Sequence, residues 1–447
     1  MSFCLLYVVD ILISLCAGLK SGRIVSLEEA VRLTGHGCFH VRLLLVSGCL
    51  VMAGVLETVV VGYLLPSATL ELGMSDQDKG LLAAASYAGI VLSSHTWGLV
   101  ADTQGRKRAL LWATLLDVVA SLLSSIAPNF EVLLGLRFCC GLFTSAPAAL
   151  TFAYLGEFHT PATRSRSIIW IGAFPSVGLI LLPGVAWAVL PQCWGWDLGF
   201  VSFGPWRLLL VLCALLSLMS ALMLWLLVPE SPKFLANREP ERALAVLRRM
   251  YALNKGGSGD LYPVDGLIGA PGTKPTVSTV ELGDSKPTAT ASSLGVGGTL
   301  RLIWAQTAPL FKPPFLLHST LVCIIQFGNL ASANGLQIWL PDIFNKLAQF
   351  EKEYPSRTAT ICAAQDAIGS SGQAPDPAHP FCAPVNEAMF RNNLIIGAVS
   401  LAMPLLCGLI VNKVGKRNLL GECPGLSCYT GRRPRPYLAE WSYSDCE

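Results

Sequence analysis

The chain has 447 residues, of which 53% are hydrophobic and only 14% are charged, and its mean hydropathy is +0.54. Soluble globular proteins carry about 25% charged residues. The composition therefore excludes an ordinary cytosolic enzyme, a nucleic-acid-binding protein and a disordered scaffold. The net charge of +3 says nothing about partners, because basic residues in a membrane protein usually set its orientation and no nucleic acid is expected.

The apolar residues fall into blocks of about 20 residues separated by short charged stretches, which is typical of a multi-pass membrane protein. Each block is predicted to be a helix, since only a helix satisfies its own backbone hydrogen bonds in lipid. The predicted spans are 41–66, 79–101, 109–127, 131–154, 167–191, 206–228, 315–344 and 392–412. The fold class is therefore predicted to be an all-α membrane protein.

The Lys and Arg residues predict how the helices are oriented. They gather after spans 2, 4, 6 and 8, whereas Pro128–Phe130 after span 3 contains none. Since cytoplasmic loops are rich in Lys and Arg, these four segments and the region before span 1 are predicted to be cytoplasmic. We expect an integral protein of the plasma membrane or of an intracellular vesicle membrane, in contact with the lipid bilayer.

A further apolar run at residues 3–19 leaves three interpretations open: a signal peptide, a ninth span or a wrongly joined first exon. A signal peptide would lack the usual basic stretch before its apolar core. A ninth span would bury Asp10 and place 20–42 outside, against the charge rule. Residues 1–40 are accordingly set apart as an N-terminal region whose status stays open.

The predicted cytoplasmic segment 229–312 has two parts. Ser231 is expected to cap a helix whose first residue is Pro232, and apolar residues then recur at helical spacing as far as Tyr251. From about residue 255 to residue 298 the chain is rich in Gly, Ser, Thr and Pro. This second part is predicted to be a flexible linker.

These features divide the chain into a complete first bundle and a partial second one. The predicted regions are a six-helix bundle (41–228), the connecting segment (229–312), a partial C-terminal bundle (313–420) and an atypical polar tail (421–447). The segment 345–391 is expected on the outer or luminal side, where Cys362 and Cys382 either form a disulfide or remain two unpaired thiols.

The sequence GLVADTQGRKR lies between spans 2 and 3. Its defining residues are Gly98, Asp102, Gly105, Arg106 and Lys107. Gly98 is expected to allow close helix approach, and Gly105 to permit a tight turn. Asp102 stands where it can meet a helix N-terminus or an arginine. The alternative interpretation is an ordinary basic turn on the cytoplasmic side.

This sequence matches the GxxxDxxGR[KR]x signature of the major facilitator superfamily, and the chain resembles members of that superfamily. YLGEFHTPATRSRS after span 4 and PESPKFL after span 6 resemble its sugar-porter-like and organic-ion branches. In those branches such residues form a cytoplasmic charge network that holds one conformation closed. The resemblance implies a network of Glu157, Arg164, Glu230 and Arg106. Solvated loop charges are the alternative, since exposed ion pairs are weak singly.

Residues 27–66 and 333–344 further resemble the synaptic vesicle glycoprotein 2 group. The resemblance implies secondary transport of a small organic ion or sugar-like solute by alternating access, possible proton or cation coupling, no cofactor and no enzyme activity. The alternative is a non-transporting membrane protein with a binding or regulatory role, as in part of that group.

Ionisable residues within a span are costly and are functional candidates. In the superfamily spans 1, 4 and 7 line the central cavity, which implies that Glu57 carries a proton or pairs with a cationic solute; a structural hydrogen bond is the alternative. Arg137 and Asp117 come to comparable depths on a helical hairpin and are candidates for a buried ion pair. A role for Arg137 in the cavity and a structural role both stay open.

In span 7, Asn334 and Gln337 lie three residues apart and share a face, which makes them candidates for solute contact. The superfamily's span 7 is broken near the solute, and Gly328 and Gly335 would permit such a break. His95, His159 and His318 are too scattered in the sequence to predict a metal site.

The segment GLIVNKVGKRN after span 8 resembles a decayed copy of the first signature, with Asn412 in place of Asp102. The apolar pattern then stops. A complete member of the superfamily has further spans, so we expect this chain to be a C-terminally truncated form. A partner chain would then be needed to cover the polar faces of spans 7 and 8.

Overall fold

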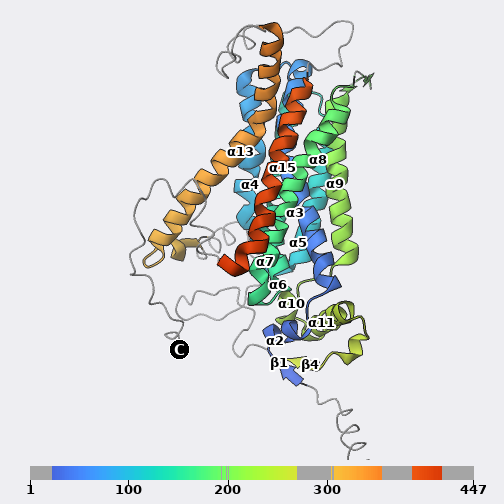
Figure 1. The fold of residues 1–447 in the computed structure, drawn as a ribbon, viewed down its shortest axis with the longest axis vertical. Coiled ribbons are helices and arrows are strands. Elements are labelled where there is room, and N and C mark those ends of the chain that lie inside the picture. The colour runs from blue at the N-terminus through green and yellow to red at the C-terminus, as the bar shows by residue number, and fades with distance from the viewer. Residues whose placement is uncertain are drawn as a thin grey trace, which may run out of the picture.

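A computed structural model describes residues 23–192, 194–197, 199, 201–268, 304, 307–354 and 385–414, with side chains as far as 409 in the last range. Long helices run side by side, and a layer of short helices and strands lies beneath one end of them (Figure 1). The predicted all-helical membrane fold is confirmed for these residues.

The first bundle consists of seven helices that correspond to the first six predicted spans. They are α3 (Cys38–Leu72), α4 (Asp76–Gln104), α5 (Arg106–Ser124), α6 (Phe130–Glu157), α7 (Pro161–Ile171), α8 (Ala173–Val189) and α9 (Pro205–Leu227). Local sequence signals set their starts. The Ser75 hydroxyl and the Asp78 carboxylate cap the start of α4 reciprocally, and Asn129 caps α6.

Composition separates these helices into two kinds. Among the described residues, six helical segments are long and apolar enough to cross a membrane: α3, α6, α7 with α8, α9, α13 and α15. The predicted spans 2 and 3 form the helices α4 and α5, which are outside this group because they are more polar. Both pack along α6, so they lie within the bundle all the same.

Helix α3 is the centre of the bundle and is buried along most of its length, with α6, α8 and α9 packed around it. The closest helix contact lies between α4 and α6. A Cβ on Gly89 would overlap the carbonyl of Phe138, and a Cβ on Gly141 would overlap the carbonyl of Ser86. Glycine is therefore required at both positions, because small residues let helix backbones approach.

The layer beneath the bundle, on the predicted cytoplasmic side, joins the N-terminal region to the segment after α9 (Figure 1). Its elements are β1 (Arg23–Val25), α2 (Leu27–Leu33), α10 (Pro232–Ala236), α11 (Pro240–Lys255), η1 (Gly259–Leu261) and β4 (Val264–Leu267). The predicted cap is confirmed, since the Ser231 hydroxyl accepts from the amides of Lys233 and Phe234.

The expectation of a flexible linker from residue 255 onward is wrong for its first part. Strand β4 pairs in parallel with β1. Tyr262 is buried and donates its hydroxyl to the carbonyl of Ala30 over 2.6 Å, and Val264 is fully buried. Two anchoring side chains inside a Gly-rich sequence are enough to order it, and composition alone did not reveal them.

The described part of the second bundle consists of η3 (Ala308–Phe311), α13 (Leu316–Glu353) and α15 (Glu387–Val414). The expected break in span 7 is not present, because α13 is continuous through Gly328 and Gly335. Neither glycine has an atom close to where a Cβ would lie. Among the described residues no neighbouring helix packs against these two glycines to favour a break, and an unbroken helix satisfies its own backbone hydrogen bonds.

The N-terminal half of α13 is exposed and leans away from the bundle, while the carbonyl of Ile338 packs on Gly62 of α3 (Figure 1). Helix α15 packs along α8. Several predictions lie outside the described residues: the N-terminal apolar run, most of the predicted linker (269–303), the pairing of Cys362 with Cys382, and the tail (421–447).

Candidate functional site

A fully buried ion pair lies inside the first bundle. Arg137 on α6 donates from Nη1 to Oε1 of Glu57 on α3 over 2.8 Å, and the side chains are 0% and 1% exposed. The guanidinium also lies 3.3 Å from the Ser124 hydroxyl through Nε and 3.4 Å from the Ser121 hydroxyl through Nη2. Three helices, α3, α5 and α6, therefore meet at this one arginine.

The predicted pairing of Arg137 with Asp117 is wrong, since the ion-pair partner is Glu57. Asp117 accepts instead from the Thr144 hydroxyl over 3.0 Å. Arg137 is level with Ser121 and Ser124 of α5. Asp117 comes four and seven residues before these serines, which is between one and two helical turns nearer the start of α5. Residue counting along a hairpin gives depth only to within about a turn, or about 5 Å.

Asp117 nevertheless belongs to the same cluster. One carboxylate oxygen of Glu57, one of Asp117 and the Cys140 sulfur all lie within 4.8 Å of one another. All three side chains are buried. When both carboxylates are ionised, the cluster has two negative charges for the single positive charge of Arg137.

One acceptor atom of the cluster is unsatisfied. Oε2 of Glu57 is buried and has no hydrogen-bond partner among the described residues. Buried polar atoms are normally paired, because leaving one unpaired costs about 1–3 kcal/mol. A proton on this carboxylate would remove the excess negative charge of the cluster.

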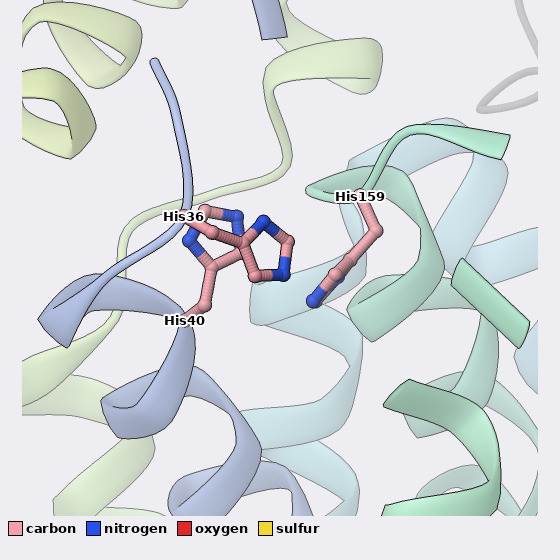
Figure 2. Close-up of side chains that lie close together, drawn as sticks. All are labelled: His36, His40 and His159. Atoms are coloured by element: carbon pink, nitrogen blue, oxygen red, sulfur yellow. The ribbon is translucent and has the colours of Figure 1, made fainter. Parts of the chain in front are cut away.

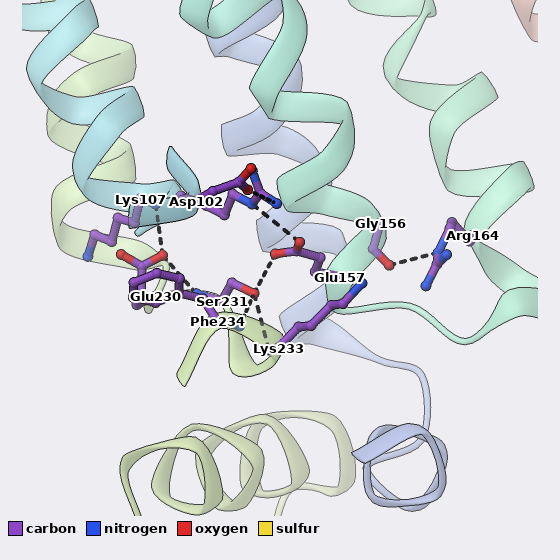
Figure 3. A network of polar contacts seen from close by, with 10 residues as sticks. Asp102, Lys107, Gly156, Glu157, Arg164, Glu230, Ser231, Lys233 and Phe234 are labelled. Carbon is purple, nitrogen blue, oxygen red and sulfur yellow. Dashed lines mark hydrogen bonds and ion pairs between the residues drawn. The ribbon is translucent and has the colours of Figure 1, made fainter. Parts of the chain in front are cut away.

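A second polar network lies at the predicted cytoplasmic end of the bundle (Figure 3). Arg106 pairs with Asp102 over 2.8 Å and, through Nε, with Oε1 of Glu157 over 3.3 Å. The Ser231 hydroxyl donates to Oε2 of Glu157 over 2.5 Å. The turn between α4 and α5 is thereby joined to the end of α6 and to the cap of α10.

Glu230 closes the other side of this network. Its Oε1 accepts from the backbone amides of Lys107, over 2.8 Å, and Ser231, over 3.0 Å. Gly105 has a φ of +109°, and a Cβ there would lie 2.6 Å from Oε2 of Glu230. The tight turn expected at Gly105 is thus present, and it also makes room for this carboxylate.

Two predicted residues are placed differently, one from the expected network and one from the signature between spans 2 and 3. Arg164 donates from Nε to the carbonyl of Gly156 over 3.0 Å, which holds the end of α6 through its backbone (Figure 3). Gly98 faces open space, with no atom near the position of a Cβ. The expectation that Gly98 allows close helix approach is therefore wrong for the described part of the chain, where Gly89 takes that role on α4.

The candidates for solute contact in span 7 are half-buried. Asn334 and Gln337 lie on α13 beside Ile338, whose carbonyl packs against α3 at Gly62, five residues beyond Glu57. Their contact with a solute remains a prediction.

Sequence reasoning missed a second ion pair, at the opposite end of the bundle from the network. Arg207 on α9 is fully buried and pairs with Glu71 of α3 over 2.7 Å. It also donates to the carbonyls of Ser125, over 3.1 Å, and Ala127, over 2.7 Å. The available signal was an arginine in the first turn of span 6, two residues after the Gly-Pro that opens it. These contacts fasten the end of α3 to the start of α9, which is a structural role.

Comparisons with known proteins show which family the sequence matches. Residues 46–421 match the family model described as the Major Facilitator Superfamily. The human Synaptic vesicle glycoprotein 2A is 28% identical over 339 residues, which are 74% of this chain and 45% of that protein. The human Synaptic vesicle glycoprotein 2B is 27% identical over 327 residues, which are 72% of this chain and 47% of that protein.

Among solved structures, the fold is similar to the xylose transporter XylE from E. coli in a partially occluded inward-open conformation. The TM-score is 0.54 at 13% sequence identity, covering 85% of this chain and 74% of that one. At this identity the likeness concerns the fold alone. The chain spans about half the length of the curated relatives it matches.

Proposed function

This chain belongs to the major facilitator superfamily and is an integral membrane protein, and from that premise we propose that it serves secondary transport of a small organic ion or sugar-like solute. Transport would proceed by alternating access, with proton coupling through Glu57. The class of solute rests on the resemblance to the sugar-porter-like and organic-ion branches.

One observation carries the coupling proposal. Glu57 pairs with the buried guanidinium of Arg137, a carboxylate oxygen of Asp117 lies within 4.8 Å of one of Glu57, and Oε2 of Glu57 lacks a hydrogen-bond partner among the described residues. A proton arriving at Glu57 would neutralise that carboxylate and weaken its hold on Arg137. The guanidinium would then be left with Asp117 as its nearest counter-charge, so protonation would rearrange contacts between α3, α5 and α6.

The network at the predicted cytoplasmic end supplies the conformational part of the proposal. Its charges are only partly buried, with 20% of the Arg106 side chain and 11% of the Glu157 side chain exposed. Such pairs contribute little singly, about 0–1 kcal/mol each. Several of them joining α4, α5, α6 and α10 are still able to bias an equilibrium between two conformations, which is how we assign their role.

The test is solute-dependent proton movement. The purified protein would be reconstituted into liposomes that contain a pH-sensitive dye, and pentoses, hexoses, organic cations and organic anions would be added in turn. We expect one class to move protons, and a pH gradient to drive accumulation of that same class. If no class of solute moved protons, in protein that remains folded and monodisperse, the proposal would be contradicted.

The similarity to synaptic vesicle glycoproteins supports a second candidate, a membrane protein that binds or regulates a partner without transport. The two candidates differ in whether they exchange solute across the membrane. A transporter exchanges labelled for unlabelled solute across the membrane without any gradient, whereas a regulatory protein binds its ligand on one side only. Binding of a solute without such exchange would favour the second candidate.

A further inference from the structure

Three histidines from two distant segments of the chain meet on the predicted cytoplasmic side. His36 precedes α3, His40 lies in its first turn, and His159 lies between α6 and α7 (Figure 2). The rings of His36 and His40 stack with centroids 4.1 Å apart, and His159 stands edge-on, 4.8 Å from His40 and 5.4 Å from His36. One nitrogen of each ring lies within 4.8 Å of the other two.

The hydrogen bonds of His159 fix its tautomer. Its Nδ1 lies 2.8 Å from the carbonyl of Leu155. A carbonyl only accepts, so Nδ1 carries the hydrogen and Nε2 keeps its lone pair. A hydrogen bond from the second ring nitrogen to a backbone carbonyl is the usual support of a metal-binding histidine, because it orients the ring and raises its basicity.

The same reasoning leaves a lone pair on His40. Its Nε2 faces the carbonyl of Phe158 at 3.3 Å and must donate, so Nδ1 carries the lone pair. The side-chain amide nitrogen of Asn254 lies 3.3 Å from this Nδ1, but it also lies 3.2 Å from the carbonyl of Thr34 and 3.0 Å from that of Gly35. An amide has two hydrogens, and the two carbonyls account for both.

The environment keeps these rings neutral, which is the form that binds a metal. Burial lowers the pKa of His159 to about 4. Partial desolvation by the neighbouring side chains, with the charge of Arg166 as a second cause, also lowers the pKa of His36. His40 and His159 are buried, while His36 is exposed and gives the cluster an opening to solvent.

We propose that His36, His40 and His159 form a binding site for one Zn²⁺ ion, with water as the fourth ligand. Three neutral imidazoles and an open position are an established zinc geometry. At tetrahedral Zn–N bonds of about 2.0–2.1 Å the nitrogens would stand roughly 3.4 Å apart. Rotation of the imidazoles closes the remaining gap, and the exposed His36 is the ring most free to turn. The charges of Arg164 and Arg166 act on His159 and His36 respectively, so they are compatible with a water or an anion as the fourth ligand.

The ion would tie the entry of α3 to the connection between α6 and α7. His159 lies two residues after Glu157, so the site adjoins the network around Arg106 without sharing a side chain with it. From the sequence, His95, His159 and His318 were too scattered to predict a metal site, and His36 and His40 were not considered with His159. His159 meets His40 across 119 positions of sequence, while His95 and His318 are exposed on α4 and α13.

The test uses the metal alone. The full chain would be purified in detergent, stripped with a chelator and titrated with Co²⁺, then with Zn²⁺ in competition. Histidine and water ligands give a tetrahedral cobalt spectrum without a thiolate charge-transfer band, so binding by any of the 15 cysteines would be recognised. We expect one such site per chain, with a cobalt spectrum that contains no thiolate charge-transfer band.

His159→Ala and His36→Ala should each weaken this site by about 100-fold or more, since loss of a mere supporting contact costs 10–100-fold. His95→Ala and His318→Ala are matched controls and should bind as the unchanged protein does. If the buried His159 proves necessary for folding, the exposed His36 variant alone decides, with monodispersity checked by size exclusion. A thiolate spectrum, no binding, or unchanged affinity in His36→Ala would overturn the proposal.

Discussion

The two polar regions of the first bundle differ in how their charges are held. The pair of Glu57 and Arg137 is cut off from solvent, at 1% and 0% exposure, and is shared by three helices. The network around Arg106 and Glu157 is partly exposed and is spread over four helices and a turn. Both contain an arginine and more than one carboxylate, but only the first leaves a buried acceptor unsatisfied.

This difference separates two physical roles. A buried charge that loses its partner has no water to replace it, so changing the protonation of Glu57 carries a large energetic consequence. A partly exposed charge that loses its partner is hydrated again at small cost. The buried pair is therefore suited to sense a proton, and the network is suited to adjust which conformation is populated.

The largest effect is expected from Arg137→Met, which leaves Glu57 and Asp117 buried together without a counter-charge. We expect a loss of about 3–5 kcal/mol of stability, measured by thermal unfolding of the protein in detergent. Adding Glu57→Gln should restore part of this loss, because one of the stranded charges is removed. Losses that simply add in the double variant would mean that the pair is not coupled.

An intermediate effect is expected from Gly105→Ala in the turn between α4 and α5. The φ of +109° and the Cβ position 2.6 Å from Oε2 of Glu230 together predict a cost of about 1–3 kcal/mol. Gly98→Ala is the matched control on the same motif. It adds a methyl group into open space within a helix, so it should be neutral or stabilising by about 0.5–1 kcal/mol. Equal losses for both would show that the turn at Gly105 is not held as described.

The smallest effect is expected from Ser231→Ala, which removes the cap of α10 and the bond to Glu157. The cap alone is worth about 1 kcal/mol. Hydrogen exchange should rise both in α10 and at the end of α6, because the network joins them. Ser75→Ala removes a cap of the same kind at the other end of the bundle and should raise exchange at the start of α4 only. If hydrogen exchange rose only in α10 of the Ser231→Ala variant, the network would not couple α10 to the end of α6.

The sequence predicted the positions of the helices well, because apolar blocks report lipid and core contact directly. It also predicted the tight turn at Gly105, since the spacing of a short motif survives from sequence to structure. The meeting of Arg106 with Glu157, 51 positions apart, was implied only by the resemblance to the superfamily. The partner of Arg137 was missed because Glu57 lies 80 positions away, and its choice depends on the rotation of three helices about their axes. A hydropathy pattern does not predict how these helices are rotated relative to one another.

The same limit explains the histidines and strand β4. His40 and His159 meet only because α3 begins at the level where α6 ends, and Tyr262 orders its segment only because Ala30 offers a carbonyl there. Each is a contact between segments that share no local pattern. Conversely, Gly328 and Gly335 permit a break in α13 without requiring one, so a local signal alone overpredicted it.

The most direct test of the account is Glu57→Gln, assayed both for exchange and for proton-driven accumulation of the solute identified in liposomes. Glutamine keeps the size of the side chain and mimics the protonated acid. The account predicts that exchange persists while accumulation under a pH gradient is lost, and that Glu71→Gln, in the structural pair with Arg207, leaves this ratio unchanged. Accumulation that persists in Glu57→Gln would contradict the claim that this carboxylate carries the coupled proton.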